Sequence, residues 1–119
     1  LKNHSKVSWV QYAGLSGHQD HELANKYLNG KPSGILTFGI KGGLKAGVKF
    51  QDELKLITRL VNIGDCKTLA THPASTTHRQ LSTEELETAG VSEDMIRLSI
   101  GIEHVEDLKS DINQALDKA

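Results

Sequence analysis

The 119-residue sequence predicts an α+β fold in which helices pack on one face of a small sheet. Residues 35–40 (ILTFGI) form a nearly continuous apolar run, which is typical of a buried strand. Residues 96–100 alternate between apolar and other residues, as a half-buried strand does. Segments with helical periodicity lie between these runs and after them. With 37% hydrophobic and 24% charged residues, the chain can form a core, and we expect one domain.

The first half of the chain is expected to contain one helix before the strand at 35–40 and one after it. Residues 20–28 have the pattern of a short helix, and the following Asn29-Gly30 is common at a helix C-terminus. A second helix is expected over 48–60. The apolar residues that recur there at helical spacing are Phe50, Leu54, Ile57 and Val61.

Shorter elements are expected in the second half. Residues 60–63 and 68–71 have the composition of short strands. Ser82 and Glu85 can form a capping box, in which each side chain binds the backbone N–H of the other, so a short helix should begin there. The last helix is expected to begin near Val105. Its apolar stripe consists of Val105, Leu108, Ile112 and Leu116.

Composition and charge argue against several classes of function. The 14 basic and 15 acidic residues give a formal net charge of −1, whereas nucleic-acid binders usually carry a basic face. No apolar run is long enough to cross a bilayer and no signal peptide opens the sequence, so we expect no membrane partner and a cytoplasmic location. Because the chain begins with Leu1 and its only methionine is Met95, we expect it to be part of a longer protein.

Cysteine and histidine do not indicate a metal site. The single cysteine, Cys66, excludes an internal disulfide and a multi-cysteine metal site, and it is expected to pack as an ordinary small residue. The six histidines lack the spacing of zinc ligands, so we expect no metal and expect the histidines to lie at the surface.

Arg97 is the most informative single residue. The alternation of its strand puts it on the face opposite Ile96 and Leu98, where a guanidinium is costly to leave unpaired. Three explanations stay open from the residues alone: it pairs with an acid of its own chain, it lies on a solvated face, or it binds the carboxylate of a ligand.

Two segments, 62–65 and 72–78, are rich in small polar residues. Backbone amides and hydroxyls at this density can form an anion-binding loop, but an ordinary connection between strands has the same composition. Both explanations stay open.

Three ordered motifs resemble a known family. Residues 60–69 (LVNIGDCKTL), 72–78 (HPASTTH) and 97–103 (RLSIGIE) are similar to the C-terminal domain of the Cys/Met-metabolism enzymes that use pyridoxal phosphate. The earlier segments that agree are 12–15 (YAGL), 23–28 (LANKYL) and 38–43 (FGIKGG). The resemblance covers about residue 8 to the end. It implies the small C-terminal domain of a fold-type-I transferase, with a mostly antiparallel sheet and helices on one side.

The resemblance implies a substrate-binding role for three residues. In similar enzymes the arginine of the Arg-Leu-Ser strand, here Arg97, binds the α-carboxylate of the amino-acid substrate. Asn62 stands where relatives commonly have the first serine of a Ser-Leu-Gly-Gly motif, which helps to hold the same carboxylate. Thr76 would line or support the wall of the site. The change to Asn-Ile-Gly-Asp points to the sulfhydrylase branch and away from cystathionine synthases and lyases.

The resemblance also implies a cofactor and a larger protein around residues 1–119. Pyridoxal phosphate needs a Schiff-base lysine, an acid at the pyridinium nitrogen and phosphate-binding groups, which in this family belong to a large N-terminal domain. Lys41 and Lys67 are expected to be solvated surface residues. We therefore expect no catalytic or cofactor-binding residue in this chain, and the isolated chain should be inactive. The whole enzyme would use O-acetylhomoserine and sulfide or a thiol to make homocysteine or methionine, and would be a homotetramer.

Two alternatives stay open. The chain can belong to another member of the family, a cystathionine γ-synthase or a methionine γ-lyase. It can also be a free-standing metabolite-binding or interaction module without catalysis.

Overall fold

Five strands form a single, mostly antiparallel sheet in the order β1-β2-β5-β4-β3. In the computed structural model, which describes all residues 1–119, β1 (Val7–Gln11), β2 (Ile35–Ile40), β5 (Met95–Ser99) and β4 (Leu69–Thr71) are antiparallel neighbours. Only β3 (Thr58–Arg59), at the edge, runs parallel to its neighbour β4. The predicted α+β architecture is confirmed.

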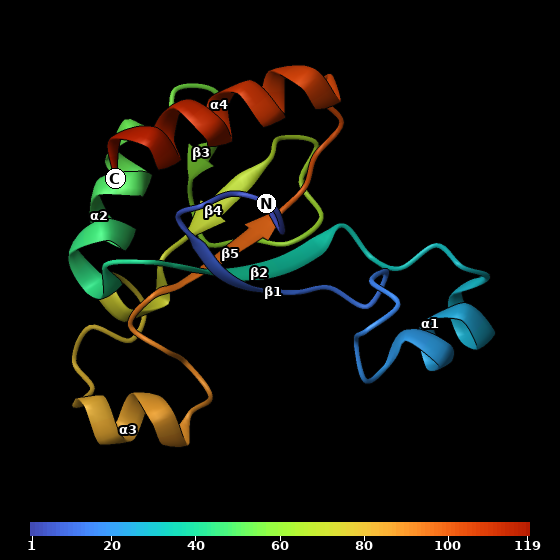
Figure 1. Ribbon diagram of the computed structural model, residues 1–119, viewed down its shortest axis with the longest axis horizontal. Coiled ribbons are helices and arrows are strands. Elements are labelled where there is room, and N and C mark those ends of the chain that lie inside the picture. Colours follow the sequence, from blue (N-terminus) through green and yellow to red (C-terminus); the bar gives the residue numbers. More distant parts are fainter.

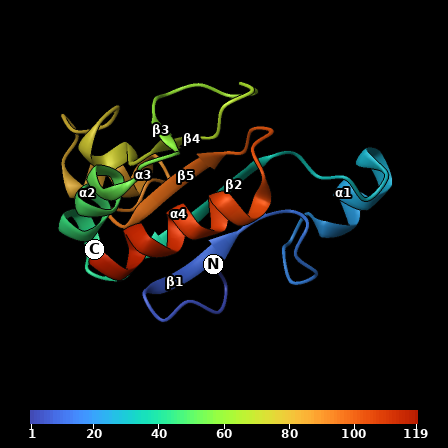
Figure 2. The ribbon, with the colours of Figure 1, turned by 90° about the horizontal axis from the view of Figure 1, so that it is seen from above.

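Two of the four α-helices cover one face of the sheet. Figure 1 shows α2 (Gly43–Glu53) and α4 (Val105–Lys118) packed together over the strands, with α1 (His21–Leu28) and α3 (Thr83–Thr88) at the periphery. In the view turned by 90°, α1 stands apart from the sheet (Figure 2). A single 3-10 turn, Pro73–Ser75, follows β4. None of the helices has the length and apolar character needed to span a bilayer.

The core lies between the sheet and the pair α2 and α4. Phe38 and Ile96 from the strands and Phe50 and Leu116 from the helices are all 0% exposed. The rings of Phe38 and Phe50 meet edge to face, with centroids 5.6 Å apart, a favoured geometry for aromatic pairs. The predicted stripe of the last helix is confirmed except at Val105, which is exposed at the start of α4.

The second helix is shifted from its predicted position. It covers Gly43–Glu53 rather than 48–60, because the chain becomes extended at Leu54. The backbone N–H groups of residues 55–57 donate to the carboxylate of Asp111 on α4, each over 2.9 Å. A side chain far along the sequence therefore binds the groups that a continuing helix would use internally.

The strand predicted at 60–63 is not formed. β3 ends at Arg59, and the Asn62 side-chain oxygen accepts the N–H of Ile63 over 2.9 Å, a local bond that competes with strand pairing. Gly64 then has φ +78°, a left-handed conformation that turns the chain.

Two further expectations were wrong. Cys66 is exposed rather than packed in the interior. His72 is fully buried rather than at the surface, and its ring nitrogens lie 2.8 Å from the Ser75 hydroxyl and from the Glu93 carbonyl oxygen. Burial lowers the pKa of His72, because the charged imidazolium loses its hydration there.

Candidate functional site

A row of polar residues crosses the face of the sheet that α2 and α4 leave uncovered. The register places Gln11 opposite Thr37, Thr37 opposite Arg97, and Arg97 opposite Thr71. Directly opposed residues share a face, and the neighbouring row, which contains Phe38, points into the core. The predicted alternation of the strand around Arg97 is therefore confirmed, and we call this uncovered side the open face.

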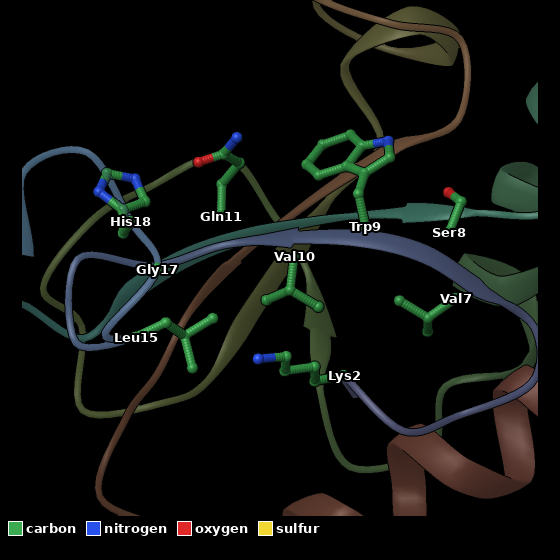
Figure 3. A pocket seen from close by; sticks show the side chains of 9 residues that line it. All are labelled: Lys2, Val7, Ser8, Trp9, Val10, Gln11, Leu15, Gly17 and His18. Carbon is green, nitrogen blue, oxygen red and sulfur yellow. The ribbon is translucent and has the colours of Figure 1, made fainter.

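One cavity, of about 400 Å³, lies along β1 at the edge of the sheet. Figure 3 shows Trp9 and Gln11 on one side of β1 and Val7 and Val10 on the other. Trp9 is fixed by a hydrogen bond from its indole Nε1 to Asp94 Oδ2 over 3.0 Å. None of the predicted site residues lines this cavity.

Arg97 has no acidic partner within the chain. Three ion pairs between Lys or Arg and Asp or Glu occur in the structure, and none includes Arg97. Its only side-chain hydrogen bond is a long one, 3.4 Å from Nη2 to the backbone oxygen of Asn62. Of the three explanations for Arg97, the structure therefore does not support pairing with an acid of the same chain. A half-buried cation on the open face retains most of its donors for water or for a ligand.

Asn62 lies beside Arg97 with one end of its side chain free. Its Oδ1 accepts the N–H of Ile63, which leaves the Nδ2 amide group as the part of the side chain that a ligand can reach. The guanidinium and this amide are both donors, and donors of this kind suit an acceptor-only group such as a carboxylate.

Thr76 lies further from the pair formed by Arg97 and Asn62. Its hydroxyl donates to the His72 backbone oxygen over 2.8 Å, and no hydrogen bond joins it to Arg97. It lines a cavity of about 270 Å³ together with Thr71, the neighbour of Arg97 on β4. The other residues that line this cavity are Gln51, Arg59, Leu60, Val61 and Ala70.

Sequence reasoning missed three residues around Arg97. Thr37 and Thr71 flank it on the open face, and Ser99, which is 3% exposed, accepts the N–H of Gly64 over 3.2 Å. Alternation of the strand places Ser99 on the same face as Arg97, but it indicates no role for this residue. The sequence does not indicate the strand register that places the two threonines beside Arg97.

The residues of this chain do not fit the covalent attachment of pyridoxal phosphate. A Schiff-base lysine is activated by desolvation or by a neighbouring cation. No lysine of the chain is buried; Lys41 and Lys67 are exposed, as predicted, and Lys41 Nζ donates to the Ser5 backbone oxygen over 2.7 Å. The His, Cys, Asp and Glu side chains likewise form no group of three that could hold a metal ion. The donors at Arg97 and Asn62 fit a carboxylate instead.

Comparisons with known proteins agree with one another. The family model described as Cys/Met metabolism PLP-dependent enzyme matches residues 1–117. The chain is 56% identical to O-acetyl-L-homoserine sulfhydrylase 1 of Thermus thermophilus and 49% identical to homocysteine synthase of Schizosaccharomyces pombe, over 98% and 100% of its length. It spans 28% of the length of each relative.

A solved structure gives the same result for the fold. The crystal structure of an O-acetylhomoserine (thiol)-lyase from Campylobacter jejuni, which contains N'-pyridoxyl-lysine-5'-monophosphate, matches with a TM-score of 0.87 and 40% identity. The match covers 98% of this chain and 28% of that one. Fold, motifs and relatives therefore place the chain in the Cys/Met-metabolism family of PLP-dependent enzymes, whose cofactor is pyridoxal phosphate.

Proposed function

We propose that residues 1–119 form the small substrate-binding domain of an O-acetylhomoserine sulfhydrylase, in which Arg97 binds the α-carboxylate of O-acetylhomoserine. One observation carries the proposal: a half-buried arginine stands on the open face with no acidic partner, and its only side-chain hydrogen bond is a long one to the backbone oxygen of Asn62. The names of the Thermus and Campylobacter relatives support O-acetylhomoserine as the substrate.

The chemistry of Arg97 suits this role. A guanidinium presents N–H groups in a planar fork that matches the two oxygens of a carboxylate and fixes its orientation. In this proposal the Asn62 Nδ2 group, which makes no hydrogen bond within the chain, serves as a further donor, and Thr76 contributes to the wall of the neighbouring cavity. A carboxylate held at both oxygens also fixes the direction of the bonds at the adjacent α-carbon, which is the positioning that catalysis requires.

The proposed net reaction replaces acetate by sulfur at the γ-carbon of the substrate. The C–O bond breaks and acetate leaves with its electron pair, while a C–S bond forms to sulfide or a thiol, giving homocysteine or methionine. Pyridoxal phosphate and its lysine would lie in a large N-terminal domain of the same protein, in a homotetramer. This chain contributes binding and orientation, so residues 1–119 alone should show no turnover.

The test is the replacement Arg97→Ala in the full-length protein. Two charge-assisted hydrogen bonds are worth about 3 kcal/mol, so kcat/KM for O-acetylhomoserine should fall by about 100-fold while bound pyridoxal phosphate, measured by its absorbance, stays constant. The matched control is Lys109→Ala, which removes an exposed cation from α4, the helix over the opposite face. Unchanged kcat/KM in Arg97→Ala would refute the carboxylate role.

A second assay separates the branches of the family. With O-acetylhomoserine as donor, the proposal predicts faster product formation with sulfide than with cysteine. Preference for cysteine would instead indicate a cystathionine γ-synthase, and release of methanethiol from methionine would indicate a γ-lyase.

A further inference from the structure

The segment 60–68, which connects β3 to β4, is tied to the rest of the domain at every second residue. We call it the crossing segment. Although it forms no strand, its hydrogen bonds recur at every second residue, as they do along a β-strand. The groups bound in order are the backbone oxygen of Leu60, the oxygen of Asn62, the N–H of Gly64, the oxygen of Cys66 and the N–H of Thr68.

Ser99 supplies the bond nearest to the candidate carboxylate site. It lies within β5 between Ile35 of β2 and Leu69 of β4, so strands on both sides fix its backbone. It shares the open face with Arg97 but is only 3% exposed. Its Oγ accepts the N–H of Gly64 over 3.2 Å, and the hydroxyl thereby joins the rigid centre of the sheet to the crossing segment.

The N–H of Gly64 forms its only hydrogen bond with Ser99 Oγ. A Cβ built at this position would meet nothing within 4 Å, so that side of the turn is open. Its φ of +78° makes it the turning point of the crossing segment. The hydrogen bond to Ser99 therefore joins this turn directly to β5.

The position of this turn determines the position of Asn62. Arg97 and Ser99 are two residues apart on β5, and Asn62 and Gly64 are two residues apart on the crossing segment. The Arg97–Asn62 and Ser99–Gly64 hydrogen bonds are therefore neighbours along the two segments. The Arg97–Asn62 hydrogen bond is long, 3.4 Å, and cannot hold the segment by itself. The shorter hydrogen bond, from the Gly64 N–H to Ser99 Oγ, therefore holds the segment two residues from Asn62, whose backbone oxygen contacts the guanidinium.

We propose that Ser99 is a positioning residue for substrate binding: its hydroxyl holds Gly64, and through it Asn62, whose backbone oxygen accepts a hydrogen bond from the Arg97 guanidinium. This inference rests on the proposed function of Arg97. It assigns Ser99 no contact with the substrate.

The experiment uses the full-length protein with Ser99→Ala, Arg97→Ala and the double variant. Ser99→Ala should raise the KM for O-acetylhomoserine about fivefold, the factor that one hydrogen bond contributes, with kcat and the KM for sulfide changed less than twofold. If Ser99→Ala only reduced the amount of folded enzyme, the apparent kcat would fall and KM would stay unchanged. In the Arg97→Ala background, Ser99→Ala should have no further effect on kcat/KM, because both act on the same bound group.

The matched control is Ser92→Ala, which removes a hydroxyl just before the opposite end of β5, where it bonds to Asp94. This variant should keep the parental KM. If Arg97→Ala leaves kcat/KM unchanged, the proposed function itself is wrong. Two results would overturn only the role of Ser99, provided that Arg97→Ala is impaired. In one, Ser99→Ala keeps the parental KM; in the other, Ser99→Ala lowers kcat/KM by the same factor with and without Arg97.

A measurement on the parental enzyme covers the case in which Ser99→Ala fails to fold. Hydrogen exchange of the Gly64 amide should be at least about tenfold slower than in an unstructured peptide, although Gly64 is exposed. Exchange at the rate of a free peptide would show that Ser99 does not hold this turn, and would overturn the inference.

Discussion

Replacement of Asp111 by Ala should lower the free energy of unfolding by about 3–4 kcal/mol, which is a large share of the stability of a domain. The Asp111 carboxylate is 6% exposed and accepts three backbone N–H groups, those of Lys55, Leu56 and Ile57, each over 2.9 Å. It therefore joins α4 to the end of α2.

The magnitude follows from the surroundings of the three donors. Ile57 is 4% exposed, so its N–H would be left without any partner, at a cost of about 2 kcal/mol. Lys55 and Leu56 are exposed, and water can replace part of their bonds, so each N–H would cost about 0.5–1 kcal/mol. The matched control is Asp107→Asn in the exposed first turn of α4, which should change stability by less than about 0.5 kcal/mol.

The contribution of Asp111 should also depend on pH. Burial would raise the pKa of this carboxyl, but the N–H donors of Ile57, Lys55 and Leu56, with Gln114, outweigh it and hold the pKa below its usual value. Because the folded pKa is the lower one, the stabilisation is complete above the unfolded pKa of about 4 and is lost as the pH falls through the folded pKa.

Urea unfolding of the parent, Asp111→Ala and Asp111→Asn between pH 7 and the lowest pH at which the parent is folded measures both effects. The difference between the parent and Asp111→Asn should shrink below about pH 4, since protonation removes the charge that Asn already lacks. A loss below 1 kcal/mol for Asp111→Ala at pH 7, or a difference that does not change with pH, would refute the reasoning.

Two further predictions concern packing, and urea unfolding tests both. Gly47→Ala should cost about 2 kcal/mol, because the new Cβ would lie 2.4 Å from Nε2 of His72, a buried ring held at both nitrogens. Gly17→Ala, which meets nothing within 4 Å, should change stability by less than about 0.5 kcal/mol; equal losses in the two variants would contradict this account. Phe50→Ala should cost about 3–5 kcal/mol, because its fully buried ring packs edge to face on Phe38. A loss below 1 kcal/mol would show that the core is not where α2 meets the sheet.

Elements that depend on nearby residues could be predicted from the sequence. The capping box at the start of α3 is present as expected: Glu85 N–H donates to Ser82 Oγ over 3.3 Å, and Ser82 N–H to Glu85 over 2.7 Å. The strand around Arg97 and the helix that begins at Val105 also follow from their own periodicity. In each case the pattern that predicts the element lies within its own residues.

Elements that depend on distant residues could not be predicted. The end of α2 is set by Asp111, which lies 54 residues beyond Ile57. Alternation predicted the face on which Arg97 lies, but the bond between Gly64 and Ser99, 35 residues apart, depends on how the crossing segment folds back over β5. The burial of His72 likewise depends on Glu93, which is 21 residues away.

The central claim is that Arg97 recognises the carboxylate of the substrate. The most direct measurement compares kcat/KM for O-acetylhomoserine with kcat/KM for its α-carboxamide, in the full-length parent and in Arg97→Ala. We expect the parent to prefer the carboxylate by about 100-fold, and Arg97→Ala to lose nearly all of that preference, because a neutral amide cannot accept the same charge-assisted bonds. An equal preference in the two proteins would contradict the account.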